Sequence, residues 1–252
     1  NTKLVCTLVT PPMRLIRFYN RYNNAGPEFI ESQDPETAKA LKRYHMMEGV
    51  SPERIQKEFI MGLASSKDTV AYLKTLRYFG MFDRVFQGLR INPNIDQLKE
   101  LKANPVLYRR PSLVIAWLLL HNDSNSVASA LNSLKYPSRG GQGAEFKLVD
   151  NVKFLLEVAK DFQPQHITRF SKEREKLLVQ FDNQAMIDLQ AAEINAWATL
   201  VGLDRNMINH FLNFQRTVTG NDARLFGKKG PALGQAINDL ETQNFLKMIN
   251  KK

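Results

Sequence analysis

The sequence contains a single cysteine, Cys6, among its 252 residues. One cysteine cannot form an internal disulfide or a cysteine zinc cluster, so we interpret Cys6 as a small buried apolar side chain in a reducing compartment. No apolar run approaches the roughly 18 residues that a membrane span needs. Residues 1–10 lack the basic start and the long apolar stretch of a signal peptide. These absences predict a soluble, cytoplasmic protein with no membrane partner.

Glycine and proline are also scarce, at 13 and 11 residues, which is low for an all-β chain rich in turns. What the sequence does have is apolar content and positive charge. Hydrophobic residues make up 43% of the chain, enough for a folded core, and the net charge is +10. An excess of this size favours polyanionic partners, above all RNA or DNA, although charge alone is a weak signal.

The apolar residues recur with helical spacing almost throughout, and no segment predicts a strand convincingly. We therefore expect an all-α fold, an elongated succession of helical hairpins. Proline-containing breaks near Pro93 and Pro164 suggest three domains, at residues 1–91, 92–162 and 163–252. Helices are expected at 13–22, 34–48, 51 onward, 68–79, 112–121, 124–134, 152–162 and 187–202, with a last helix after Gly230.

A cluster of arginines lies on the first expected helix. Arg14, Arg17 and Arg21 are spaced i, i+3 and i+7, so they share one helical face, while apolar side chains such as Ile16 and Tyr19 fall on the other. This split predicts a guanidinium stripe on an exposed face. A plain solvated basic face is an equally good interpretation.

The third expected helix opens at Ser51-Pro52-Glu53-Arg54, with Ser51 as N-cap and Pro52 in the first turn. Within it, Glu53 and Lys57, and likewise Arg54 and Glu58, are spaced i, i+4 with opposite charge, which predicts ion pairs along the helix.

Residues suited to catalysis are missing. Asp-x-Asp, a pattern that could hold Mg²⁺ for nucleotidyl transfer, does not occur, nor does a nucleophile elbow, a phosphate loop or a dinucleotide fingerprint. His121 and Asp123 could begin the ligand set of a metal phosphohydrolase, but the further ligands cannot be assembled. A helix end with local hydrogen bonds is the better interpretation. We expect no catalytic residue, metal ligand or cofactor in this chain.

A segment near the C-terminus differs from the rest. Lys228 and Lys229 precede the expected last helix, with Gly230 and Gly234 at its start. Backbone N–H groups, the positive end of a helix dipole and two ammonium groups would suit a phosphate. The alternative is a glycine-rich turn with solvated lysines.

Several segments, in order, resemble the class II CCA-adding tRNA nucleotidyltransferase and poly(A) polymerase family. Met13–Tyr22 is similar to a neck-helix run Leu-Arg-x-x-Arg-Phe-x-x-Arg-Leu, and Val50–Glu58 to Ile-Ser-x-Glu-Arg-Ile-x-x-Glu-Leu. The other segments that carry the resemblance are Asp34–Thr37, Leu76–Phe86, Leu131–Pro137 and Val218–Gly234.

The resemblance implies helical neck, body and tail domains that bind tRNA or another RNA. It also implies that Mg²⁺ and nucleoside triphosphate bind to a catalytic head domain without a counterpart here, so that nucleotidyl transfer in tRNA processing belongs to a parent enzyme. The positions that select the nucleotide in the family are occupied by Leu8 and Pro11. A stand-alone RNA-binding or interaction protein derived from the family is the alternative.

The resemblance implies RNA or nucleotide binding by Arg14, Arg17, Arg21, Arg54, Gly230 and Gly234, and the local pattern adds Lys228 and Lys229 as candidates. It assigns a structural brace to Glu53 and Glu58, because an arginine–carboxylate pair can fix the angle between two crossing helices.

Overall fold

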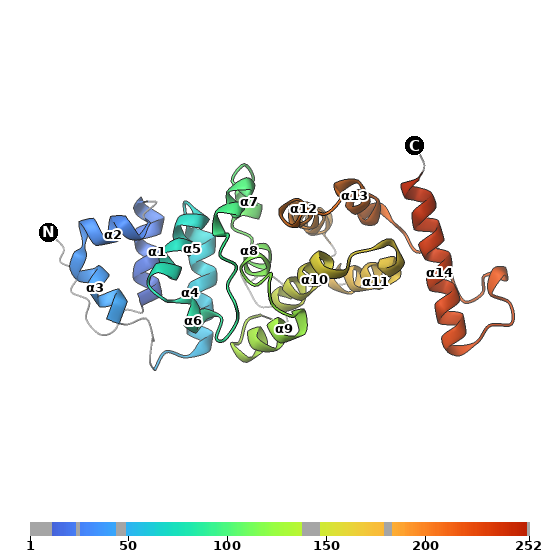
Figure 1. Ribbon diagram of the computed structural model, residues 1–252, viewed down its shortest axis with the longest axis horizontal. Helices are drawn as coiled ribbons and strands as arrows, with labels where there is room; N and C mark the ends of the chain where they lie inside the picture. The colour runs from blue at the N-terminus through green and yellow to red at the C-terminus, as the bar shows by residue number, and fades with distance from the viewer. Residues whose placement is uncertain (1–11, 24–25, 44–48, 138–146, 179–182, 251–252) are drawn as a thin grey trace. The chain divides into compact units, whose positions relative to one another are not determined.

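Figure 1 presents a computed structural model of the chain, which describes residues 12–23, 26–43, 49–137, 147–178 and 183–250. These residues form helices joined by short connections, and no strand occurs among them, which confirms the all-α class. Cys6, Leu8 and Pro11 lie outside the described residues. No helix in the described ranges combines the length and the apolar character that a membrane crossing requires.

The helices, including the short 3₁₀ helices η1–η3, follow one another along the chain in this order: α1 (Pro12–Asn23), α2 (Pro27–Gln33), α3 (Pro35–Arg43), α4 (Pro52–Ser65), α5 (Thr69–Tyr78), α6 (Phe82–Val85), η1 (Ile95–Leu101), α7 (Pro105–Tyr108), α8 (Pro111–Leu118), α9 (Ser124–Ser133), α10 (Leu148–Asp161), η2 (Pro164–His166), α11 (Ile167–Leu178), α12 (Gln184–Val201), α13 (Arg205–Asn213), η3 (Ala223–Leu225) and α14 (Gly230–Ile249).

The chain divides into two compact units, Asn1–Lys153 and Phe154–Lys252, called here the first and the second unit. The expected division into domains at 1–91, 92–162 and 163–252 stays a prediction.

Local signals in the sequence account for several helix ends. Asp68 caps α5, since its carboxylate accepts a hydrogen bond of 3.1 Å from the N–H of Ala71. Gly80 follows α5 with φ of 70°, a left-handed conformation that glycine adopts without strain. Ser51 stands at the N-cap of α4 as expected, but its side chain does not cap the helix. The Ser51 hydroxyl interacts with the Glu53 carboxylate instead.

Aromatic rings fill the core of the first unit. Phe59 of α4 lies edge-on to Phe86 with ring centroids 5.3 Å apart, and Phe86 stacks on Tyr136 at 6.1 Å. Tyr72 of α5 is fully buried beside Phe59. Its ring lies directly against Gly62 of α4, where any Cβ would collide with the phenol group. The absence of a side chain at Gly62 therefore permits the close packing of α4 on α5.

The second unit has its own aromatic core. Trp197 of α12 is fully buried, and its indole N–H donates a 2.6 Å hydrogen bond to the carbonyl of Leu155. The ring of Phe162 lies between those of Phe170 and Phe211, with centroids 5.3 and 5.1 Å away. These contacts join α10, α11, α12 and α13 into one packed body, on which α14 also packs.

Candidate RNA-binding surface

Helix α1 presents two of its three arginines to solvent. Met13 and Ile16 are buried against α4 and α5, which orients the opposite face outward. Arg14 and Arg21 lie exposed on that face, whereas Arg17 is only partly exposed. The expected split of the helix into an apolar and a basic side is present, with Arg17 at the border between them.

Arg17 forms an ion pair with α4. Its Nη2 lies 3.2 Å from Oε2 of Glu58, and both side chains are less than a fifth exposed. The two ion pairs expected within α4, Glu53 with Lys57 and Arg54 with Glu58, are not found among the described residues, so this prediction was wrong. Glu58 faces α1 rather than the solvent side of its own helix, so the guanidinium that reaches it comes from another helix. The Arg17–Glu58 pair joins two crossing helices.

Glu53 and Arg54 lie exposed in the first turn of α4. The pKa of Glu53 is lowered by hydrogen bonds from its own backbone N–H and from the Ser51 hydroxyl, and more weakly by the positive charge of Lys135. Glu53 therefore acts within the helix start, and Glu58 is the residue that forms a bond between helices.

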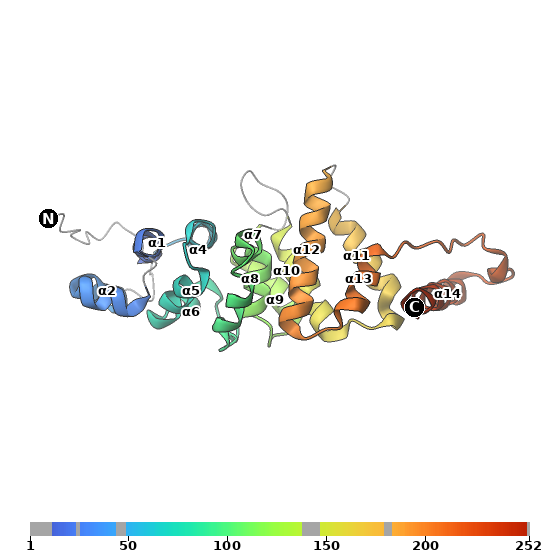
Figure 2. The same cartoon turned by 90° about the horizontal axis from the view of Figure 1, so that it is seen from above.

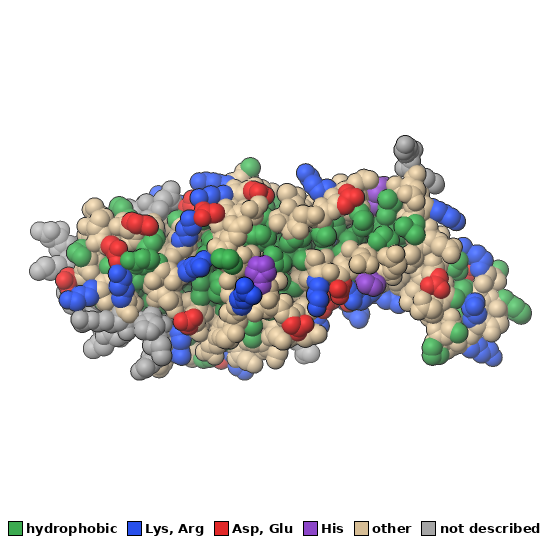
Figure 3. Space-filling model, viewed as in Figure 1, with side chains coloured by type: hydrophobic (Ala, Val, Ile, Leu, Met, Phe, Trp, Pro, Cys, Tyr) green, Lys and Arg blue, Asp and Glu red, His purple; other side chains and the backbone are tan. Residues whose placement is uncertain are grey.

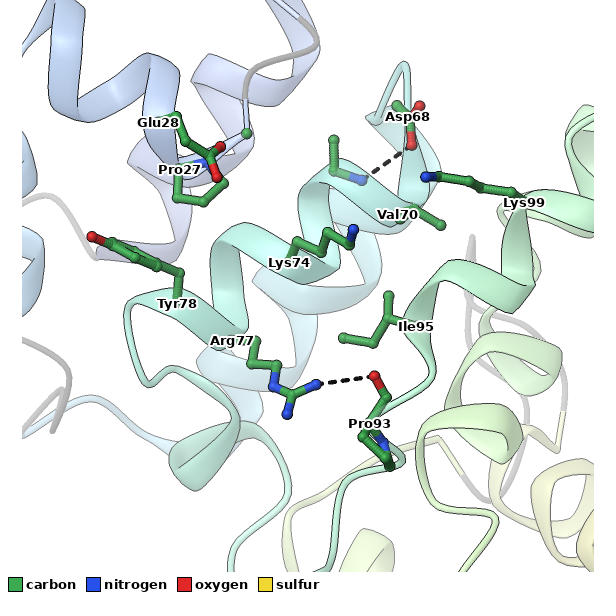
Figure 4. Close-up of a pocket in the computed structure, with 12 residues that line it drawn as sticks. Pro27, Glu28, Asp68, Val70, Lys74, Arg77, Tyr78, Pro93, Ile95 and Lys99 are labelled. Carbon is green, nitrogen blue, oxygen red and sulfur yellow. Dashed lines mark hydrogen bonds between the residues drawn. The ribbon is translucent and has the colours of Figure 1, made fainter.

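An open groove of about 640 Å³ lies in the first unit along α5. Figure 4 shows α5 running between Pro27 and Glu28 of α2 on one side and Ile95 and Lys99 of η1 on the other. The residues that line the groove are Gly26, Pro27, Glu28, Asp68, Val70, Ala71, Lys74, Arg77, Tyr78, Pro93, Ile95 and Lys99. Sequence reasoning missed the groove, although Lys74 and Arg77 share a helical face by their i, i+3 spacing.

One carboxylate and one backbone carbonyl hold the cations around the groove. Asp96 lies 2.7 Å from the Lys74 ammonium and 2.6 Å from that of Lys99, and these two bonds lower the pKa of Asp96. Arg77 donates to the carbonyl of Pro93 at 3.1 Å, which keeps its charge at the groove. The basic side chains are thus positioned by partners but are not all neutralised.

Asp68 anchors the other end of the groove. Burial alone would raise its pKa, but hydrogen bonds from the Tyr108 hydroxyl at 2.7 Å and the Ala71 N–H, together with Lys102 at 3.3 Å, lower it. Burial and the bond to Asp68 raise the pKa of Tyr108. The carboxylate therefore fixes the start of α5 and ties it to α7.

Helices α2, α3 and α5 meet at an exposed cluster of three side chains. Glu31 accepts a hydrogen bond of 2.6 Å from the Tyr78 hydroxyl and pairs with Lys42 at 2.5 Å. The Lys42 ammonium lies 5.1 Å from the centroid of the Tyr78 ring. This cluster holds an aromatic ring, about half exposed, at the edge of the groove.

The predicted segment near the C-terminus forms a loop of the second unit. Figure 2 shows the chain between α13 and α14 extending away from the helices and returning to the start of α14. Lys228 and Lys229 are exposed, and α14 begins at Gly230, which has φ of 54°. Gly234 lies exposed in the first turns of α14. The binding roles of these residues stay a prediction, as do those of Arg14, Arg17, Arg21 and Arg54.

Glu241 anchors this loop, and sequence reasoning missed it. The side chain is fully buried in α14, and Oε1 accepts hydrogen bonds of 2.7 Å from the backbone N–H groups of both Thr217 and Val218. The only signal in the sequence for a buried carboxylate at Glu241 is that this acidic residue lies among apolar ones on α14. A buried carboxylate bound to two backbone amides fixes the base of the loop.

The segment His121-Asn122-Asp123 is a helix junction. Asp123 caps α9 through a 2.9 Å hydrogen bond from the Ser126 N–H, and Asn122 bonds to both backbone groups of Arg90. His121 is exposed. Throughout the described ranges, no three His, Cys, Asp or Glu side chains are grouped so that they could hold a metal ion.

Charged side chains of both signs are distributed over the face shown in Figure 3, where Lys and Arg outnumber Asp and Glu. The charge pattern alone therefore does not mark one binding surface on this face.

Comparison with known proteins identifies the first unit more closely. Residues 33–92 match a family model described as the probable RNA and SrmB-binding site of polymerase A. No curated protein and no solved structure matches the chain. The matched segment contains α3 to α6, so it includes α5 with Lys74 and Arg77, and also α4 with Glu58. This part of the chain is similar to the RNA-binding region of the poly(A) polymerase family, and the similarity supports an RNA-binding role.

Proposed function

We propose that the chain binds RNA through the first unit, using the exposed arginines of α1 and the basic wall of the α5 groove. The observation that carries the proposal is the match of residues 33–92 to an RNA-binding region, because that segment includes the wall with Lys74 and Arg77. The structural core supports it, since α1 packs directly on α4 and α5 of the matched segment. An excess of cations over carboxylates attracts a phosphate backbone.

The RNA that we propose is tRNA or another RNA whose 3′ end is extended. The ordered segments similar to the CCA-adding and poly(A)-adding enzymes motivate this choice. In this proposal the chain positions the RNA in the cytoplasm, while Mg²⁺ and nucleoside triphosphate bind to residues of a catalytic head outside this sequence. Arg17 and Glu58 then serve the fold rather than the RNA, because they pair with each other and both side chains are less than a fifth exposed. Lys74, by contrast, is 45% exposed and shares the single carboxylate of Asp96 with Lys99, so one positive charge of these three groups is left for a phosphate.

Binding of a fluorescently labelled tRNA, followed by anisotropy at increasing salt, tests the proposal. If Arg14, Arg21, Lys74 and Arg77 each neutralise one phosphate, the logarithm of the affinity should fall with the logarithm of salt with a slope of about −3. Between about 50 and 200 mM salt the affinity should then fall roughly 100-fold. An affinity that does not change with salt would contradict the proposal.

A matched pair of double variants tests the location of the surface. Arg14→Gln with Lys74→Gln should reduce the magnitude of the slope by about 1.5 to 2, because two phosphate contacts are lost. Lys160→Gln with Lys247→Gln removes the same charge from exposed positions of α10 and α14 and should leave the slope nearly unchanged. If both double variants reduced the slope equally, RNA binding would depend on the net charge of the chain and not on this surface.

A further inference from the structure

The most exposed large apolar side chain in the described part of the chain is Phe226. It is 96% exposed, whereas the next, Val106, is 59% exposed. Phe226 lies in the loop between α13 and α14, directly after η3. A phenylalanine ring this exposed loses the favourable burial that the other aromatic residues of the chain obtain, so its position needs a separate explanation.

The backbone directs this ring outward. The preceding Leu225 is only 3% exposed and fixes η3 against the second unit. The N–H of Phe226 bonds to the carbonyl of Ala223 at 3.3 Å, and the N–H of Lys228 bonds to that of Leu225 at 3.1 Å. Gly227 has φ of 81°, which turns the chain immediately after the ring. Local hydrogen bonds on both sides thus hold Phe226 at the tip of a structured turn.

Basic residues lie on both sides of Phe226 in the sequence. Lys228 and Lys229 are exposed. Neither forms an ion pair with another described residue, whereas the nearby Arg224 does. The Arg224 guanidinium pairs with Asp222 at 2.6 Å, and this arginine lowers the pKa of Asp222 to about 2. Asp222 is the sole acidic residue of segment 214–230, which therefore carries a net positive charge. An exposed aromatic ring beside unpaired ammonium groups complements a ligand that has both a flat apolar face and negative charge.

We propose that Phe226 stacks on an unpaired base of single-stranded RNA, while Lys228 and Lys229 contact the phosphates on either side of that nucleotide. This inference rests on the proposed RNA binding and specifies a second contact, in the second unit. Bases in a duplex already stack on their neighbours, so a lone ring at a loop tip can reach the face of an unpaired base only. An apolar protein surface fits less well, because the two lysines would have to lose their hydration next to it.

Replacing the ring with an indole provides a direct reporter. The native Trp117 and Trp197 are both buried, so an exposed indole in a Phe226→Trp variant is selectively accessible to quenchers and to bound bases. The probes are a single-stranded oligoadenylate and a blunt, fully paired RNA duplex. The oligoadenylate should quench the emission of the new indole, and the duplex should leave it nearly unchanged.

Affinity measurements with the ring removed provide the second test. Phe226→Ala should weaken binding of the oligoadenylate roughly tenfold, because stacking on one base is lost. Binding of the duplex should stay the same. The control is Val106→Ala, which trims another exposed apolar side chain and should change neither affinity. Circular dichroism of each variant verifies that the helices are retained.

The outcomes separate this inference from the proposed function. If the native chain binds neither the labelled tRNA nor the two RNA probes, the proposed function fails and the inference falls with it. If the native chain binds RNA but Phe226→Ala binds the oligoadenylate equally well and the indole is not quenched, only the inference is overturned. The inference is also overturned if the indole responds to vesicles of phosphatidylserine and not to the oligoadenylate.

Discussion

The buried Glu241 offers the sharpest test of how the second unit is held together. Its carboxylate is fully buried, and one oxygen, Oε1, accepts both backbone hydrogen bonds from the base of the loop at 2.7 Å. The other oxygen, Oε2, is buried without a hydrogen-bond partner. Replacement by alanine removes both bonds, and replacement by glutamine removes the charge but keeps an oxygen acceptor.

The expected losses of unfolding free energy follow from these contacts. A hydrogen bond to a charged group contributes about 1.5–3 kcal/mol, so two such bonds give about 3–6 kcal/mol. Thr217 is exposed, so its N–H group can form a hydrogen bond with water once the carboxylate is removed. Glu241→Ala should therefore lower the free energy of unfolding by about 3 kcal/mol, the lower end of that range. Glu241→Gln should cost about 1–2 kcal/mol, because a neutral acceptor is weaker and its amide N–H₂ would be buried without a partner.

Urea unfolding followed by Trp197 fluorescence measures these changes in the second unit. A Trp117→Phe background removes the signal of the first unit, where Trp117 is buried. With a denaturant slope of about 1.5–3 kcal/mol per molar, Glu241→Ala should lower the midpoint by about 1–2 M. The matched control is Asp239→Asn on the same helix, where the carboxylate is exposed and bonds only to Gln235.

The control should change the stability by less than about 0.5 kcal/mol. Equal effects of Glu241→Gln and Asp239→Asn would refute the anchoring role, since the loss would then reflect the charge of α14 and not the two backbone bonds. Amide hydrogen exchange at Thr217 and Val218 gives an independent measure, and it should accelerate in Glu241→Gln.

Two further predictions concern the first unit. A double-mutant cycle with Arg17→Met and Glu58→Gln should give a coupling free energy of about 1 kcal/mol or more, above that of fully exposed pairs, because both side chains are mostly buried. Additive effects would show that the pair does not connect α1 to α4. The pKa of Asp68 is lowered in the folded state, so its contribution to stability is present at neutral pH and is lost as the pH falls through the folded pKa. Asp68→Asn should therefore destabilise the first unit at pH 7, and the difference from the native chain should shrink as the solution is acidified, as urea unfolding monitored through Trp117 would reveal. A difference that stays constant would contradict this assignment.

Features encoded within a few neighbouring residues were accessible from the sequence. One turn of chain is enough to determine three of the helix ends. These are the start of α4 at Pro52, the end of α5 before Gly80 and the end of α12 at Gly202. Proline in the first turn and glycine in a left-handed conformation act regardless of what packs around them. The all-α class follows from the same local patterns.

Features that depend on contacts between distant residues were not accessible. Spacing along α4 favoured a pair between Arg54 and Glu58, but the sequence cannot reveal that Glu58 faces α1. Helix α2 was missed because its seven residues contain only a short apolar pattern. The groove along α5 and the anchor at Glu241 each combine elements far apart in the chain, so no spacing rule identifies them.

The stacked rings of Phe86 and Tyr136 limit where the chain can be truncated without exposing its core. Phe86 lies within the segment that matches the RNA-binding family model, whereas Tyr136 lies well beyond it, and its hydroxyl also donates to the carbonyl of Val85. Asn92, at the end of that segment, bonds to the backbone of Trp117 and Leu118 in α8. A peptide restricted to residues 33–92 would therefore leave one side of its aromatic core open to water, and the region defined by sequence similarity is smaller than the unit that folds cooperatively.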